Sequence, residues 1–201
     1  EDGGVDVIAV HLVDGAPTGA YHPLCRLGAG QCVLGLGRAT AQAPIGLLAV
    51  CLPQTRLAVV PEPGSLQASA VDWLDGWLLA HTHNKPPFPP RAYRDGQPGT
   101  GVSLAAGESL YSAHGVLWID AAQAPGATEV SAAVQGETAS ALSWMPANQA
   151  MPAPALFPLT PTTWATAPSP CELTPLSSAE VLRSGRLEAS LAAFHRALLT
   201  H

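Results

Sequence analysis

The chain has 201 residues, of which 47% are hydrophobic and 12% charged, and its formal net charge is −6. This length suits a domain with a sizeable core, and the apolar content excludes a disordered chain. The acidic balance and the lack of a basic stripe argue against nucleic-acid binding. No apolar run reaches roughly 18 residues without a proline, glycine or charge, so the sequence predicts no membrane span.

The scarcity of charge is informative, because an average soluble domain has roughly 25% charged residues. An uncharged exterior is typical of an interface, so we expect other protein subunits, in a homo- or hetero-oligomer, to cover much of it. A compositional bias is the alternative explanation. Lys85 is the only lysine against eight arginines, and alanine, glycine and proline are abundant, as in proteins from GC-rich genomes.

Short apolar runs dominate the first part of the chain. Residues 5–12 alternate in a β-branched pattern that predicts a strand. The runs 31–37, 46–51 and 56–60 are each bounded by glycine, proline or polar residues, and they predict three buried strands.

A helical pattern opens at Ser65, a suitable N-cap, and we expect it to end at Gly76. Residues 77–81 then predict a strand that leads into His81-Thr82-His83. The stretch 84–101 is rich in proline, glycine and polar residues, which predicts a long ordered loop.

The second half of the chain contains three more predicted strands, at residues 115–120, 129–135 and 141–145. Residues 146–176 contain eight prolines, which predicts an extended segment that packs on its own domain or on a neighbour. Ser177 and Glu180 form the pattern of a capping box that starts a helix. That helix has one apolar stripe and a possible kink at Gly185; the stripe consists of Leu187, Leu191, Phe194 and Leu198.

These elements predict an α/β or α+β fold with a single mixed sheet of about five to seven strands, flanked by about two helices. The predicted organisation is a mixed core domain over residues 1–145, the proline-rich extended segment 146–176 and a C-terminal amphipathic helix over 177–201. The helix would pack on the core or on a partner.

The most specific chemical feature is the pair His81 and His83, followed by Asp95. On a strand, two histidines at i and i+2 share one face, so both imidazoles reach one metal ion. A carboxylate from the following loop would be a third ligand and leave a position for an activated water. The alternative is that His81 caps the strand and His83 bonds backbone in the loop.

Residues 73–95 resemble the JAMM motif of MPN-domain metalloproteases, in which a strand ends in His-x-His-Pro and a serine and an aspartate follow. The resemblance implies a curved sheet flanked by helices, cleavage of isopeptide or peptide bonds, and zinc held by His81, His83 and Asp95. In this chain Asn84 replaces the proline, and Asp95 lies slightly further along than the pattern. The stretch 28–35 contains no carboxylate in place of the catalytic glutamate, so the motif is degenerate.

Other residues offer weaker alternatives. Glu108 and His114 are alternate metal ligands. The four cysteines fit no zinc or redox spacing; their even number permits two disulfides, although the apolar run around Cys51 predicts a buried thiol there.

Two functions follow from these patterns. The first is a non-catalytic binding or structural subunit of a larger protein assembly, on a degenerate MPN-like scaffold, which accounts for the low charge and the missing glutamate. The second is a zinc-dependent hydrolase that uses His81 and His83 with Asp95 or Glu108. The sequence favours the first.

Overall fold

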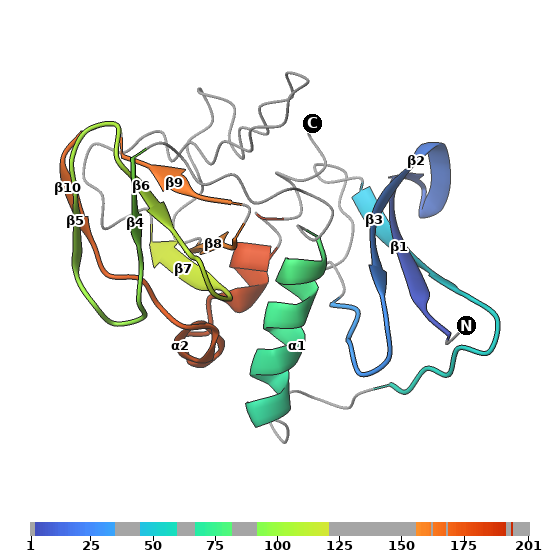
Figure 1. Cartoon of the computed structure of the whole chain (residues 1–201). Coiled ribbons are helices and arrows are strands. Elements are labelled where there is room, and N and C mark those ends of the chain that lie inside the picture. The colour runs from blue at the N-terminus through green and yellow to red at the C-terminus, as the bar shows by residue number, and fades with distance from the viewer. Residues whose placement is uncertain are drawn as a thin grey trace. The chain divides into compact units, whose positions relative to one another are not determined.

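The structure is a computed structural model that describes residues 3–34, 45–59, 67–81, 92–120, 156–161, 163–167, 169–191 and 194. The chain forms two compact units, Glu1–His81 and Thr82–His201 (Figure 1). The described part is α+β and rich in small sheets, which confirms the predicted class. The prediction of a single mixed sheet is wrong, because the described strands form four separate sheets of two or three strands.

The N-terminal unit contains an antiparallel sheet of three strands in the order β2-β1-β3. The predicted strands are present as β1 (Val5–Val13) and β3 (Ile45–Cys51). A two-residue turn, Asp14-Gly15, joins β1 to β2 (Ala16–Leu27), and both turn residues have positive φ angles of 53° and 79°. Such a turn matches the twist of the strands it connects.

Strand β2 was not among the predicted elements, because Pro17, Gly19 and Pro23 argue against a strand. It lies at the edge of the sheet, where prolines are tolerated, and its register with β1 shifts at two places. Two other predictions are wrong in their described parts. Residues 31–34 and 56–59 form no strand, and Leu57 and Val59 are exposed rather than buried.

The N-terminal unit also contains helix α1 (Gln67–Ala80), which contacts β2. Gly76 lies inside this helix and does not end it, so the predicted strand over residues 77–81 is wrong. Leu74, Trp77 and Leu78 are buried. Their spacing places them on one helix face, and this burial offsets the low helix propensity of glycine. In the described part of the chain, no helix has the length and hydropathy required to cross a membrane.

The C-terminal unit contains three small sheets, β4-β6-β9, β5-β10 and β7-β8. Only the pair β4 and β6 is parallel among its described strands. The strands are β4 (Tyr93–Asp95), β5 (Val102–Leu104), β6 (Ser109–Tyr111), β7 (Leu117–Asp120), β8 (Leu156–Leu159), β9 (Ala165–Thr166) and β10 (Cys171–Leu173).

Strand β7 confirms the strand predicted over residues 115–120. Strand β4 interrupts the long loop predicted over residues 84–101, of which 84–91 lie outside the described residues. The predicted strands 129–135 and 141–145, and the predicted boundary after residue 145, also lie outside them. In the described part of the proline-rich segment, β8, β9 and β10 pair with strands of the same chain.

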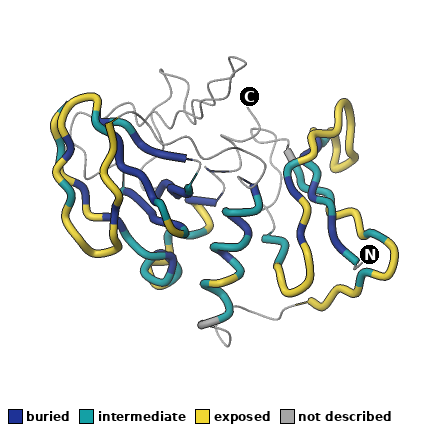
Figure 2. The backbone as a smooth tube through the Cα atoms, viewed as in Figure 1, coloured by how far each residue is buried: buried dark blue, intermediate teal, exposed yellow. Residues whose placement is uncertain are grey.

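The core of the C-terminal unit is centred on β7 and β8, whose residues are almost all buried (Figure 2). Trp118 is fully buried, and its indole Nε1–H donates to Ser178 Oγ at 2.8 Å. The backbone N–H of Leu156 donates to Ser190 Oγ at 2.9 Å. The core therefore pairs these polar groups as it buries apolar side chains.

The predicted capping box is confirmed at the start of α2 (Ser178–Arg183). The Ser177 N–H donates to Glu180 Oε2 at 2.7 Å, and the Glu180 N–H donates to Ser177 Oγ at 3.3 Å. The predicted single C-terminal helix is interrupted, because Gly185 adopts a positive φ of 69° after α2 ends. Residues 187–191 and 194 are helical again, and Leu191 and Phe194 of the predicted stripe are buried.

Candidate functional site

His81 lies in the turn that follows α1, at the end of the N-terminal unit. Its side chain is buried, and Nδ1 lies 2.7 Å from the Trp77 carbonyl oxygen. The two rings meet edge to face with their centroids 4.5 Å apart. Burial holds the pKa of His81 below its ordinary value of 6.5, while the hydrogen bond to Trp77 acts in the opposite direction.

The hydrogen bond to Trp77 defines which nitrogen of the imidazole carries the hydrogen. Because a carbonyl oxygen can only accept, Nδ1 carries the hydrogen, and the neutral ring keeps its lone pair on Nε2. Metal-binding histidines often have such a bond to a backbone carbonyl, but a histidine that only packs against its helix has it too. The strand geometry used to predict the site does not apply to His81, and His83 lies outside the described residues.

The other predicted ligands lie in the C-terminal unit. Asp95 is exposed at the end of β4, and its Oδ1 accepts a hydrogen bond from the backbone N–H of Ala113 at 2.9 Å. His114, which follows Ala113 in the sequence, is exposed in the turn after β6. The structure therefore places Asp95 and His114 on neighbouring segments, and the carboxylate serves to hold the turn.

Glu108 lies just before β6, and its carboxylate makes two contacts. Its Oε2 accepts from the backbone N–H of Ala105 at 3.0 Å, and its Oε1 lies 2.9 Å from Arg94 Nε. The hydrogen bond from Ala105 and the nearby Arg94 hold the pKa of this carboxyl below its ordinary value of 4.5, against a smaller opposing effect of burial. These contacts, from its own loop and from β4, stabilise the ionised carboxylate.

The described candidate ligands are divided between the two units, with His81 in the first and Asp95, Glu108 and His114 in the second. No group of three or more histidine, cysteine, aspartate or glutamate side chains comes together among the residues that the structure describes. The zinc site and the resemblance to the JAMM motif stay predictions.

A second candidate site is the outer edge of β3. The N–H of Leu52 donates to the carbonyl oxygen of Gly4 at 2.8 Å, and the register places Leu48 opposite Ile8. Hydrogen-bonded and non-hydrogen-bonded pairs alternate in an antiparallel ladder. It follows that Leu48 and Val50 bond to β1, whereas the backbone groups of Leu47, Ala49 and Cys51 point away from the sheet.

Apolar residues are exposed on β3 and in the segment that follows it in the sequence. Ala49, Val50 and Cys51 are exposed on β3, and Val50 is 45% exposed. Beyond the strand, Leu57 and Val59 are 64% and 95% exposed. In contrast, Tyr93 is the exposed large hydrophobic residue of the described C-terminal unit.

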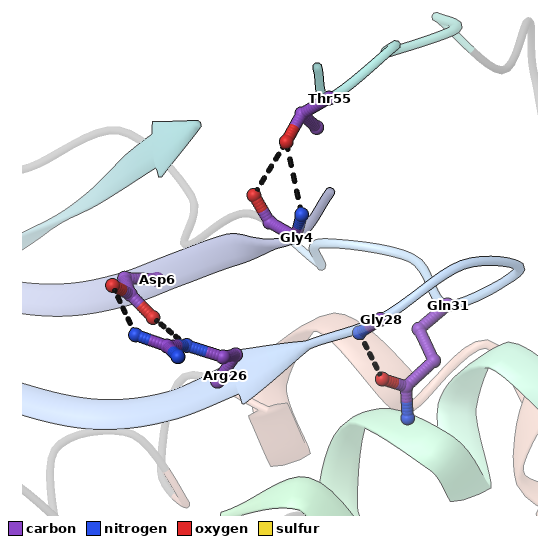
Figure 3. Close-up of polar contacts among 6 residues, drawn as sticks. All are labelled: Gly4, Asp6, Arg26, Gly28, Gln31 and Thr55. Carbon is purple, nitrogen blue, oxygen red and sulfur yellow. Dashed lines mark hydrogen bonds and ion pairs between the residues drawn. The ribbon is translucent and has the colours of Figure 1, made fainter. Parts of the chain in front are cut away.

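The opposite edge of the same sheet has the features by which proteins prevent strand pairing. Strand β2 contains Pro17 and Pro23, which lack an N–H, and its ladder with β1 is irregular. Near its end, Arg26 forms an exposed two-pronged ion pair with Asp6, with distances of 2.6 and 3.0 Å (Figure 3). Strand β3 has no proline, no charge and no register shift along β1.

On β3, the exposure of Cys51 differs from the prediction. All four are free thiols. Cys51 is exposed, so the predicted burial of its thiol is wrong, whereas Cys25 on β2 is buried. The sequence signal of the β3 edge is the uncharged run 46–51, which predicts a buried strand.

Three comparisons with known proteins add no relative. The chain matches no family model, and it has no match among curated proteins or solved structures.

Proposed function

We propose that this protein is a non-catalytic binding subunit of a larger protein assembly, and that it docks through its N-terminal unit. The observation that carries the proposal is the outer edge of β3, where Leu47, Ala49 and Cys51 present backbone groups outward. An uncharged strand edge is a template for pairing with another chain.

Exposed apolar residues support the same function. Val50 is exposed on β3, and Leu57 and Val59 are exposed in the segment after it; such residues are typical of surfaces that partners cover. Only 12% of the residues in the chain are charged, and depletion of charge is characteristic of the buried centre of an interface.

The carboxylates also fit this proposal better than zinc hydrolysis. The Asp95 carboxylate caps the turn at Ala113, and Glu108 binds the Ala105 N–H and Arg94. Both carboxylates therefore have structural roles within the C-terminal unit.

Zinc content and molecular mass in solution test the proposal together. We expect a mass above that of one chain by light scattering, and no stoichiometric zinc by elemental analysis. About one zinc per chain, lost in a His81→Ala/His83→Ala variant but kept in a His114→Ala control, would show a metal centre at the predicted histidines. Zinc-dependent peptide hydrolysis by the same preparation would then overturn the proposal in favour of a hydrolase.

A further inference from the structure

We propose that the partner of the β3 edge is β3 of a second copy of this chain, paired antiparallel about a twofold axis at Ala49. This inference rests on the proposed function and names its partner. The two sheets would join into one sheet in which the order β2-β1-β3 continues into β3-β1-β2 of the second copy.

The backbone supports this register. Leu47, Ala49 and Cys51 point their N–H and C=O groups outward. With Ala49 opposite its own counterpart, Leu47 lies opposite Cys51 and Cys51 opposite Leu47. Each becomes a hydrogen-bonded pair that exchanges two bonds, so about six hydrogen bonds close the edge. A helix or an irregular loop cannot match this alternation of donors and acceptors, whereas a strand can.

The side chains are compatible with a second copy. In this register Leu48 lies opposite Val50 in a non-hydrogen-bonded pair, where side chains are closest. The pair covers the exposed Val50 with a leucine from the same sheet face. Ala49 faces a second alanine, so the centre of the interface contains no bulky clash.

Charge favours the same partner. A strand that pairs with itself about a twofold axis places each charge opposite or near its own copy, which is repulsive. Strand β3 contains no charge, and Arg56 is five positions beyond Cys51. The other edge of the sheet could not pair in this way, because Pro17 and Pro23 remove N–H groups from β2.

Charge variants at Ala49 test the twofold axis directly. We expect Ala49→Lys and Ala49→Glu each to weaken self-association at least about tenfold, because each places like charges opposite one another. A mixture of the two variants pairs opposite charges and should regain the mass of the wild-type dimer by light scattering. Ala49 is exposed, so the circular dichroism spectrum of each variant should match that of the wild-type chain.

Cysteine pairs provide a second test that does not depend on charge. In a Cys51→Ser background, Leu48→Cys/Val50→Cys should form disulfide-linked dimers under oxidation, because Cα atoms of a non-hydrogen-bonded pair lie about 4.5 Å apart, within disulfide range. The matched control, Ala20→Cys/His22→Cys on the exposed part of β2, should stay largely uncross-linked.

The outcomes separate this inference from the proposed function. If the wild-type chain associates and neither charge variant changes its mass, the β3 edge is not the interface, but the chain is still an assembly subunit. A wild-type chain that stays monomeric at every concentration, and whose β3 cysteine pair does not cross-link, overturns the pairing of copies. The zinc measurement then decides between a subunit for a different protein and a hydrolase.

Discussion

The two units differ in how far they bury their apolar residues and pair their polar groups within themselves. The C-terminal unit buries Trp118, Phe157 and Leu159 and pairs polar groups within itself, as in the bond from Trp118 to Ser178. The N-terminal unit buries one row of β1 residues but leaves Ala49, Val50 and Cys51 of β3 exposed. This difference separates stability from association. Substitutions in the C-terminal core should change unfolding, whereas substitutions at the β3 edge should change the assembly.

The largest effect on stability is expected at Trp118. Trp118→Ala should lower the free energy of unfolding by about 3–5 kcal/mol, because it leaves a cavity in the core and removes the donor to Ser178. Urea unfolding measures the change. Trp118→Phe keeps most of the ring and loses the hydrogen bond, so its cost should be smaller, about 1–3 kcal/mol.

The contrast between a C-terminal core that sets stability and a β3 edge that sets association would be wrong if Trp118→Ala altered self-association without changing the urea midpoint. That result would place the indole at an interface instead of in the core of the C-terminal unit.

A smaller effect on stability is expected at Thr55, which bonds to Gly4 just before β1 of the N-terminal sheet. The Thr55 hydroxyl donates to the Gly4 carbonyl at 2.8 Å and accepts from the Gly4 N–H at 2.9 Å (Figure 3). Thr55→Val keeps the shape and loses both bonds, so unfolding should become easier by about 1–3 kcal/mol. Thr55→Ser, which keeps the hydroxyl, is the control. Equal unfolding midpoints for all three chains would show that this contact contributes nothing.

Local signals predicted some elements of this fold correctly. The β-branched alternation of β1 and the capping box of Ser177 and Glu180 are present as expected. Both depend on neighbouring residues alone, which is why the sequence suffices. The Asp14-Gly15 turn was an equally local signal for a hairpin, but the prolines of β2 concealed the second strand.

Other elements depend on contacts that no short pattern reveals. The apolar residues 77–80 fit a strand or a buried helix, and the burial of Trp77 and Leu78 in α1 decides for the helix despite Gly76. This outcome moves His81 from a strand end to a helix end and removes the geometric basis of the predicted histidine pair. The division into several sheets is likewise a long-range property, since β7 pairs with β8 across a gap of many residues.

A pH effect is expected at the capping box. The Ser177 N–H and hydroxyl hold the pKa of the Glu180 carboxyl below its ordinary value of 4.5. A carboxyl with a lowered pKa contributes stability above the unfolded-state pKa and loses it as the pH falls through the folded-state value. Below pH 4.5 the wild-type chain should therefore lose stability more steeply than Glu180→Gln. Parallel pH profiles for the two chains would contradict this role of the carboxylate.

The smallest effect concerns the two cysteines of the N-terminal sheet, of which Cys25 on β2 is buried and Cys51 on β3 is exposed. Burial, together with the nearby Asp6, raises the pKa of Cys25 to about 11, so at pH 8 only about one thiol in a thousand is ionised. Cys51 is exposed on β3. Iodoacetamide followed by mass spectrometry should therefore modify Cys51 well before Cys25. Because pairing of β3 with a second copy covers the backbone beside Cys51, its modification should also slow as the protein concentration rises. Equal rates at both cysteines would mean that the sheet opens readily, and a Cys51 rate independent of concentration would place the interface elsewhere.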